Sequence, residues 1–287
     1  MSLFGAFDIQ VDGVSLNLGV SGATRSLLQY LLCFHGRPTR REQLHDMFWP
    51  DTRVDRRRSS LNSAIWRLRK ALADVPALKL DATTECVRLA GVDDDEVQID
   101  FVRLESALRR TVEGEEASLS GLLAALEHCG AAPLDGLADE WAVVERERLS
   151  SLRTRALTTA MRSLSGERRY DEAIEMGRRI LVTDPYRECA FQEVMCLHVL
   201  NGDRARAMRA FVDFAKMLRS ELEIEPMAET RMLRDYLASD ACFDRGARPD
   251  EAAAAILEYA SRPGVDQLLC SIEASRLSLR QTAAAVA

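Results

Sequence analysis

The sequence predicts a mainly α-helical protein with a small β component, arranged as a mixed N-terminal part followed by an all-helical part. Runs of alternating apolar and polar residues, typical of strands, occur only in about the first 100 residues. Helical periodicity with polar breaks fills the chain from about Phe101 onward, and a 34-residue spacing recurs within it. A length of 287 residues suggests two domains of ~150 residues each, and the composition is that of a soluble globular protein.

The first elements are expected to be a strand pair and a buried helix. Residues 7–11 and 14–18 alternate apolar and polar side chains on either side of Asp12-Gly13, a strong hairpin turn. Residues 23–34 are too apolar for an exposed helix, so we expect this helix in the core. His35-Gly36 closes it, because glycine readily adopts the left-handed conformation that ends many helices.

Two further helices follow in the N-terminal part. The first, residues 40–48, ends before Pro50, because proline disfavours a helical conformation in the residue ahead of it. A loop that carries three consecutive arginines then leads to the second helix. This helix is expected over residues 61–72, with Ser59 or Ser60 as its N-cap.

A second hairpin closes the N-terminal part. Residues 78–81 and 87–89 read as strands on either side of residues 82–85. The order of strands, three helices and a hairpin predicts a winged helix-turn-helix. In that arrangement the third helix enters the major groove of DNA, and the terminal hairpin is the wing.

The helix at residues 61–72 combines an apolar stripe with a basic outer face. At about 100° per residue, its large apolar side chains share one side: Leu61, Ile65, Leu68 and Leu72. From Arg37 to Lys70 there are ten Lys/Arg and four Asp/Glu, whereas the whole chain carries a net charge of −7. A locally positive helical unit in an acidic protein suggests DNA binding, because phosphate contacts dominate such affinity. An ordinary solvated amphipathic helix explains this single feature equally well.

The residues expected to contact DNA fall into two groups. Those on the outer face of the helix are placed at base edges or in the groove: Asn62, Ser63, Trp66, Arg67 and Lys70. Those before the helix, at its entrance and on the wing are assigned to phosphates: Arg40, Arg56, Arg57, Arg58 and Arg88. For Trp66, packing against the wing is favoured over stacking on a DNA sugar. Arg69 lies nearer the apolar stripe and is expected to pair within the protein.

Two segments of the helical part repeat with the period of tetratricopeptide units. Ala173 and Ala207 are 34 residues apart, and Ala156-Leu157 has the same spacing from Ala190-Phe191. Paired helices need small residues where they approach each other closely. Such solenoids usually bind other proteins, and the alternative is that the repeats only support a helical domain.

The sequence argues against an enzyme, a metalloprotein and a membrane protein. Its glycines lack phosphate-loop or dinucleotide spacing, and no Gly-x-Ser-x-Gly elbow occurs. Seven cysteines and four histidines form no cluster with metal-ligand spacing, and Asp93–Glu96 is interpreted as a solvated turn. No apolar run reaches the ~20 residues of a membrane span, and the odd cysteine count fits a reducing cytoplasm. We therefore expect a cytoplasmic protein without catalytic residues, cofactor or metal.

A set of motifs occurs in a fixed order along the chain. They are Trp66-Arg67-Leu68-Arg69-Lys70-Ala71-Leu72, Trp141-x3-Glu145-Arg146-Glu147-Arg148-Leu149, Tyr170-Asp171-Glu172-Ala173-Ile174, Thr183-Asp184-Pro185-Tyr186-Arg187-Glu188, Met195-x6-Gly202-Asp203 and Glu221-Leu222-Glu223-Ile224-Glu225-Pro226. Together they resemble the SARP-type bacterial regulators, in which an OmpR-type winged helix precedes a bacterial transcriptional activator domain. The resemblance runs from about Leu3 to about Leu237. The wing departs from it, because Cys86-Val87-Arg88-Leu89 stands where the family often has glycine-tyrosine-x-leucine.

The resemblance implies a promoter-binding activator that recognises direct repeats in the major groove and recruits RNA polymerase. The implied partners are double-stranded promoter DNA, RNA polymerase, a second copy of the chain, and a small-molecule or protein effector. The expected domains are a winged helix over 1–92, a tetratricopeptide-like activator domain over 93–240 and a helical extension over 241–287. Two alternatives stay open. One is an adaptor that binds proteins through its repeats and does not bind DNA; the other is a ligand-gated regulator.

Overall fold

The computed structural model describes residues 1–238, apart from residues 12, 13, 17, 74, 76, 92–97, 116 and 131. The predicted turn Asp12-Gly13, the acidic run Asp93–Glu96, the border near residue 92 and the extension 241–287 lie outside the described residues. Within them the chain is mainly helical with small antiparallel sheets, which confirms the predicted fold class. None of the described helices has the length and apolar character needed to cross a membrane.

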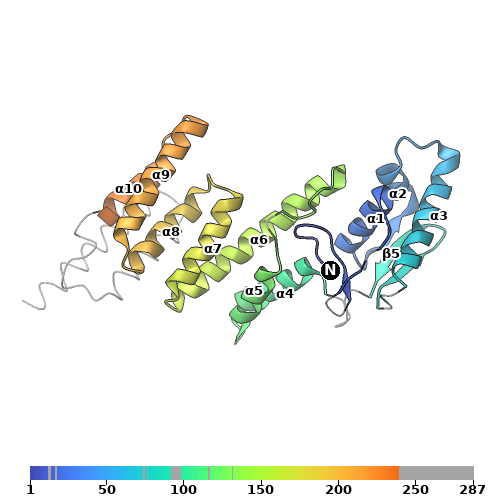
Figure 1. Ribbon diagram of the computed structural model, residues 1–287, viewed down its shortest axis with the longest axis horizontal. Coiled ribbons are helices and arrows are strands. Elements are labelled where there is room, and N and C mark those ends of the chain that lie inside the picture. Colours follow the sequence, from blue (N-terminus) through green and yellow to red (C-terminus); the bar gives the residue numbers. More distant parts are fainter. Residues whose placement is uncertain are drawn as a thin grey trace, which may run out of the picture. The chain divides into compact units, whose positions relative to one another are not determined.

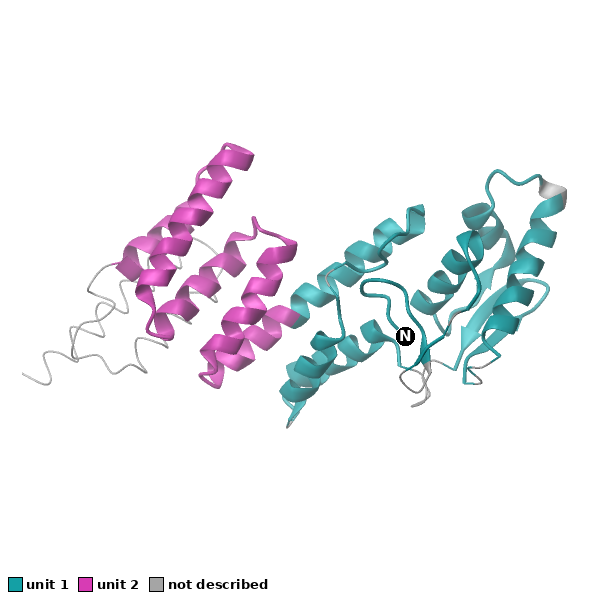
Figure 2. Ribbon diagram, viewed as in Figure 1, with its two compact units in different colours: residues 1–156 teal, residues 157–287 magenta. Residues whose placement is uncertain are grey.

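The chain divides into two compact units, residues 1–156 and 157–287, which Figure 2 colours separately. The division falls inside helix α6, which runs from Glu140 to Gly166. The first unit therefore contains more than a winged helix. It also includes α4 (Asp100–Val112), α5 (Ser118–Glu127) and the beginning of α6.

The β structure of the first unit is smaller at its start and larger at the wing than the sequence predicts. β1 (Gln10–Val11) and β2 (Val14–Ser15) pair antiparallel over two residues each, so both are shorter than the predicted strands. The wing strands β4 (Lys79–Ala82) and β5 (Cys86–Ala90) form the predicted hairpin. The strand β3 (Thr39–Arg40) was not predicted; it pairs with β5 and gives the strand order β3-β5-β4. A two-residue strand is too short to show periodicity in a sequence.

Helix α3 begins earlier than predicted. It runs from Val54 to Ala71, so the three arginines at 56–58 lie in its first turns and not in a loop. The N-cap is Arg53, and neither predicted serine caps the helix: the hydroxyls of Ser59 and Ser60 both donate to the carbonyl of Arg56. Arginine is a good helix former, and a serine inside a helix can bond back to a preceding carbonyl, so nothing stops the helix at residue 59.

The winged helix is held together by a leucine core. On α3, Leu61 and Leu68 are fully buried and Ile65 is 4% exposed, which confirms the predicted stripe. Helix α3 packs against α1 (Gly22–Cys33), α2 (Arg41–Phe48) and the wing strand β4, and Figure 1 shows α1 and α2 beside α3. Full burial of one leucine contributes about 2 kcal/mol, so this core fixes which face of α3 meets solvent.

The N-terminal segment and α4 are joined by one buried carboxylate. Oδ2 of Asp100 accepts from the backbone N–H of Leu3 at 2.7 Å and of Phe4 at 2.8 Å, and Oδ1 accepts from the backbone N–H of Phe101 at 2.8 Å. Burial raises the pKa of Asp100, while these hydrogen bonds oppose that shift. Leu3 and Phe4 are themselves buried. Asp100 thus fastens the segment ahead of β1 to the helical part of the first unit.

Aromatic side chains join α1 and α2 to the start of α6. The ring of Trp141 meets that of Tyr30 edge-on, with 5.3 Å between centroids, and lies 6.4 Å from that of Phe48. Beside them, the hydroxyl of Ser26 donates to Asp139 at 2.9 Å. Residues far beyond the wing in sequence therefore complete the packing of the first unit.

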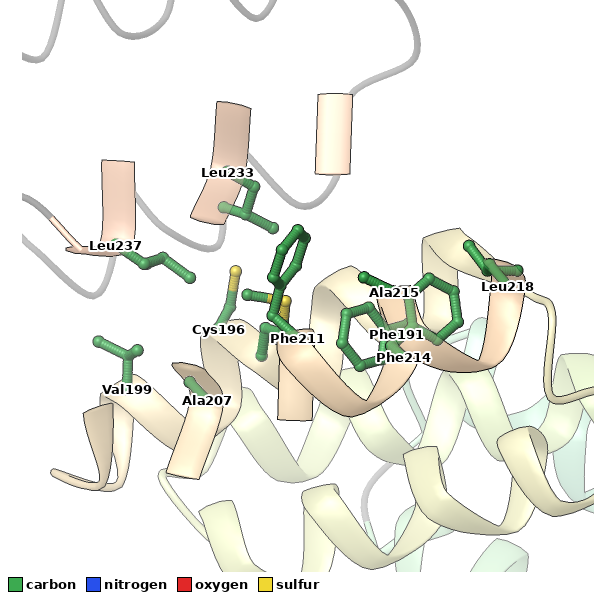
Figure 3. Close-up of a cluster of buried hydrophobic side chains, with 11 residues drawn as sticks. Phe191, Cys196, Val199, Ala207, Phe211, Phe214, Ala215, Leu218, Leu233 and Leu237 are labelled. Carbon is green, nitrogen blue, oxygen red and sulfur yellow. The ribbon is translucent and has the colours of Figure 1, made fainter. Parts of the chain in front are cut away.

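The described part of the second unit, Leu157–Ala238, contains the predicted helical repeats. Its helices are α7 (Tyr170–Thr183), α8 (Glu188–Leu200), α9 (Arg204–Leu222) and α10 (Ala228–Ala238). The 34-residue pair Ala173 and Ala207 is fully buried, as close packing of paired helices requires. In Figure 3, the rings of Phe191 on α8 and Phe214 on α9 lie together; they stack with centroids 4.0 Å apart.

His198 on α8 makes the stability of the second unit sensitive to pH. The side chain is 6% exposed, and burial, followed by the charge of Arg206, lowers its pKa below the ordinary value of about 6.5. A base with a lowered folded-state pKa is charged less readily in the folded than in the unfolded chain. Its contribution to stability is therefore present above pH ~6.5 and is lost as the pH falls through the lowered pKa.

We expect His198→Gln to reduce the loss of unfolding free energy between pH 7.5 and pH 5. The free energy of unfolding of the full chain is measured at both pH values by urea denaturation, with circular dichroism as the signal. Other titrating groups, such as His45, are unchanged between the two proteins, so the difference isolates His198. Identical pH dependence in both proteins would contradict this expectation.

Candidate nucleic-acid interface

The outer face of α3 is the candidate interface. The five residues expected at bases or in the groove are all exposed: Asn62, Ser63, Trp66, Arg67 and Lys70. They lie opposite the buried stripe, so the predicted division of the helix into two faces is confirmed. Their contacts with DNA stay predictions.

Trp66 does not pack against the wing as the sequence analysis favoured. The residue is 64% exposed and lines a groove together with residues of the wing turn. Instead, the ammonium of Lys70 lies 5.7 Å from the centre of the indole ring. The two residues are four apart on one helix, a spacing that brings side chains together and that the sequence analysis did not use. The helix thus presents an aromatic ring and a cation side by side.

Most of the arginines assigned to phosphates are free to meet an anion. Arg40, Arg56 and Arg58 are exposed and form no ion pair within the described part of the chain. Arg40 lies in β3 and the other two in the first turns of α3. Together with Arg67 and Lys70, they make this part of the first unit strongly positive.

Arg57 has a structural role instead of a free charge. Its guanidinium pairs with Asp46 of α2 at 2.7 Å and donates to the carbonyls of Thr52 and Pro50 at 2.8 and 2.7 Å. Only 25% of the side chain is exposed. Arg57 thus braces the connection between α2 and α3, and its phosphate contact stays a prediction.

Arg88 and Arg69 both have partners near the wing. Arg88 on β5 pairs with Asp81 on β4 at 2.8 Å, with 46% of the Arg88 side chain exposed. Exposed pairs of this kind contribute only ~0–1 kcal/mol, so Arg88 can exchange its partner for a phosphate at little cost. Arg69 donates to the carbonyl of Leu80 at 3.4 Å, in line with its expected pairing within the protein.

Arg41 belongs to this surface and was not predicted from the sequence. Its guanidinium donates to Oδ1 of Asn62 on α3 and, at 3.2 Å, to the carbonyl of Thr83 in the wing turn. Its backbone N–H donates to the carbonyl of Glu85 at 2.9 Å. These partners are 21 or more residues away, so no local spacing could reveal them. Arg41 joins α2, α3 and the wing.

A groove of about 1180 Å³ runs between α2, α3 and the turn of the wing. It is lined by Arg40, Arg41, Glu42, His45, Arg58, Asn62, Ile65, Trp66, Arg69, Ala82, Thr83, Thr84, Glu85 and Cys86. Burial, followed by the charge of Arg41, lowers the pKa of His45, so this ring is neutral at pH 7. The positive charge of the groove therefore comes from its arginines.

Comparison with known proteins identifies both parts of the chain. Residues 17–90 match the family described as transcriptional regulatory protein, C terminal, and residues 99–237 match the bacterial transcriptional activator domain. The regulatory protein AfsR of Streptomyces coelicolor is 26% identical over 259 residues, or 88% of this chain. The chain spans 26% of the length of that relative.

A solved structure has the same fold. It is EmbR of Mycobacterium tuberculosis, in complex with a low affinity phosphopeptide, with a TM-score of 0.68 and 20% identity. The match covers 91% of this chain and 69% of EmbR. With an OmpR-type winged helix followed by a bacterial transcriptional activator domain, the chain belongs to the SARP-type family of transcriptional regulators.

Proposed function

We propose that this chain is a sequence-specific DNA-binding regulator that places α3 in the major groove of promoter DNA and activates transcription. The observation that carries the proposal is the exposed face of α3, on which hydrogen-bonding and cationic side chains stand opposite a buried apolar stripe. A helix of this kind fits the major groove, where base edges offer a distinct pattern of donors and acceptors. The family supports the same assignment.

The proposed contacts divide between bases and phosphates. Arg67, Lys70, Asn62 and Ser63 are assigned to base edges, and the Trp66 ring to the groove wall. The free arginines of β3 and the start of α3, with Arg88 on the wing, are assigned to phosphates. Phosphate contacts set the register of the protein on the duplex, and base contacts determine which DNA sequence is recognised.

The second unit is proposed to contact RNA polymerase or other proteins. The resemblance to SARP-type regulators supports this role, together with binding to direct repeats and pairing of two copies. Stacked helical repeats provide extended surfaces suited to protein partners. A small-molecule or protein effector would act through the same unit.

We expect Arg67→Ala to lower affinity for the preferred duplex by about tenfold or more and to relax discrimination at one base pair. Arg58→Ala should lower the affinity for all duplexes by the same factor. It should also reduce the slope of log affinity against log salt by ~1, because one fewer counterion is released. Both are measured by fluorescence anisotropy over a salt series, with duplexes selected from a random pool.

The control is Arg110→Ala, an exposed arginine of α4 that pairs with Glu115 and lies outside the groove. The duplex affinity and the salt slope of this variant should match those of the unmodified chain. Absence of duplex binding at low salt would reject the proposal and favour the adaptor alternative. Equal effects of all three substitutions would reject the division into base and phosphate contacts.

A further inference from the structure

We infer that Arg41 is a positioning residue that makes Asn62 select guanine over adenine in the major groove. This inference rests on the proposed function and adds a base preference to it. The basis is the hydrogen bond by which Arg41 occupies the amide oxygen of Asn62. One lone pair of that oxygen is then taken by a cation, whereas both N–H donors of the amide nitrogen stay available to a base.

The chemistry of the two groups fixes the orientation of the Asn62 amide. A guanidinium has only N–H donors, so it can bond only to the oxygen of the amide and not to its NH2 group. Oδ1 of Asn62 therefore faces Arg41, and Nδ2 points away from it. The residue is exposed on α3, so the two N–H donors of Nδ2 are available to a ligand.

Arg41 is held in place by the surrounding fold. It is the first residue of α2 and follows β3, which pairs with the wing strand β5. Its second guanidinium nitrogen donates to Thr83, and its backbone N–H donates to Glu85. The guanidinium is thus held at Thr83 and the backbone at Glu85, so rotation of the Asn62 amide would turn its NH2 donors toward the donors of Arg41.

This arrangement disfavours the usual way in which asparagine recognises adenine. In that pairing the amide oxygen accepts from adenine N6 while the amide nitrogen donates to N7. Here the N6 amino group would compete with a cation for the same oxygen. Guanine presents two acceptors, N7 and O6, and both suit an amide that offers only donors.

The neighbouring side chains favour the same base. Arg67 and Lys70, on the same exposed face of α3, are donors without acceptor capacity. The carboxylates in the groove belong to Glu42 on α2 and Glu85 in the wing turn, and not to α3. The outer face of α3 is therefore rich in donors, which match the acceptor-rich edge of guanine.

The test compares base preferences of the unmodified full chain with those of three variants: Asn62→Ala, Arg41→Met and Arg41→Lys. Each protein selects duplexes from a random pool, and the enrichment of each base is counted at every position. We expect the unmodified chain to show a guanine that Asn62→Ala loses. In Arg41→Met the oxygen is released, and the ratio of guanine to adenine at that position should fall by about tenfold. Arg41→Lys keeps a cationic donor and should retain guanine.

Several outcomes would overturn the inference. One is adenine at the Asn62-dependent position in the unmodified chain, and another is an unchanged preference in Asn62→Ala or in Arg41→Met. If Arg41→Met does not melt cooperatively, the base preference of Arg41→Lys decides. Loss of the guanine preference in Arg41→Lys then contradicts the inference, and its retention supports the inference. Failure of the unmodified chain to enrich any sequence would overturn the proposed function as well. Enrichment without an Asn62-dependent guanine overturns only this inference.

Discussion

Replacement of Gly91 by alanine is expected to destabilise the first unit more than any other small substitution in the wing. Gly91 follows β5 with a φ of +90°, which side-chain-bearing residues rarely adopt. A Cβ built there would lie 1.7 Å from the carbonyl oxygen of Ala77 and 2.9 Å from its carbon. These are backbone atoms next to the wing, so no side chain can rotate away to make room.

The expected loss is about 3 kcal/mol or more in the free energy of unfolding, because backbone strain adds to overpacking. Domains are stable by only ~5–15 kcal/mol, so a large part of the stability would be lost. The loss of unfolding free energy is measured by urea denaturation, with tryptophan fluorescence as the signal. Since the wing is distorted, duplex affinity should fall as well.

Gly114 provides the matched control. Its φ is +76°, and a Cβ there would meet nothing within 4 Å. Gly114→Ala therefore carries only the cost of the left-handed conformation, about 1 kcal/mol. An unchanged urea midpoint for Gly91→Ala, or equal losses for the two variants, would show that close approach to Ala77 does not determine the effect.

A fragment of residues 1–92 is expected not to unfold cooperatively, although it contains the whole winged helix. It lacks Asp100, whose carboxylate holds the backbone of Leu3 and Phe4. It also lacks Trp141, the ring that meets Tyr30 edge-on. Hydrogen bonds to a charged group contribute about 1.5–3 kcal/mol each, and aromatic pairs about 0.5–1.5 kcal/mol beyond burial. Their combined loss, about 5 kcal/mol, equals the whole stability of many domains.

The comparison is a fragment of residues 1–166, which retains α4, α5 and all of α6. Differential scanning calorimetry should show one endothermic transition for 1–166 and none for 1–92. A second comparison uses Trp141→Ala in the longer fragment, which should lower its melting temperature without abolishing the transition. A cooperative transition of 1–92 at any temperature would contradict the expectation.

Local patterns predicted much of this architecture. The stripe of Leu61, Ile65 and Leu68 was visible because helical periodicity places residues three and four apart on one face. The β4–β5 hairpin and the buried alanines Ala173 and Ala207 were visible for similar reasons of period and spacing. The same stripe identified the exposed face of α3, and with it the candidate interface.

Features that depend on packing were missed or mistaken. The start of α3 was placed too late, because serines favour caps but are tolerated inside a helix whose buried face already stabilises it. Trp66 was expected against the wing and lies exposed. Arg57 could not be told from Arg56 and Arg58 in a run of three arginines, yet only Arg57 meets Asp46.

The sequence by itself determined the helices, the wing hairpin and the two faces of α3, because each follows from periodicity over neighbouring residues. Only the tertiary structure decided that Trp141 and Asp100 complete the first unit and that Arg41 occupies the amide oxygen of Asn62. Such contacts join residues far apart in the chain. They depend on the relative placement of elements, which is set by burial of apolar faces and satisfaction of buried polar groups and leaves no local signal.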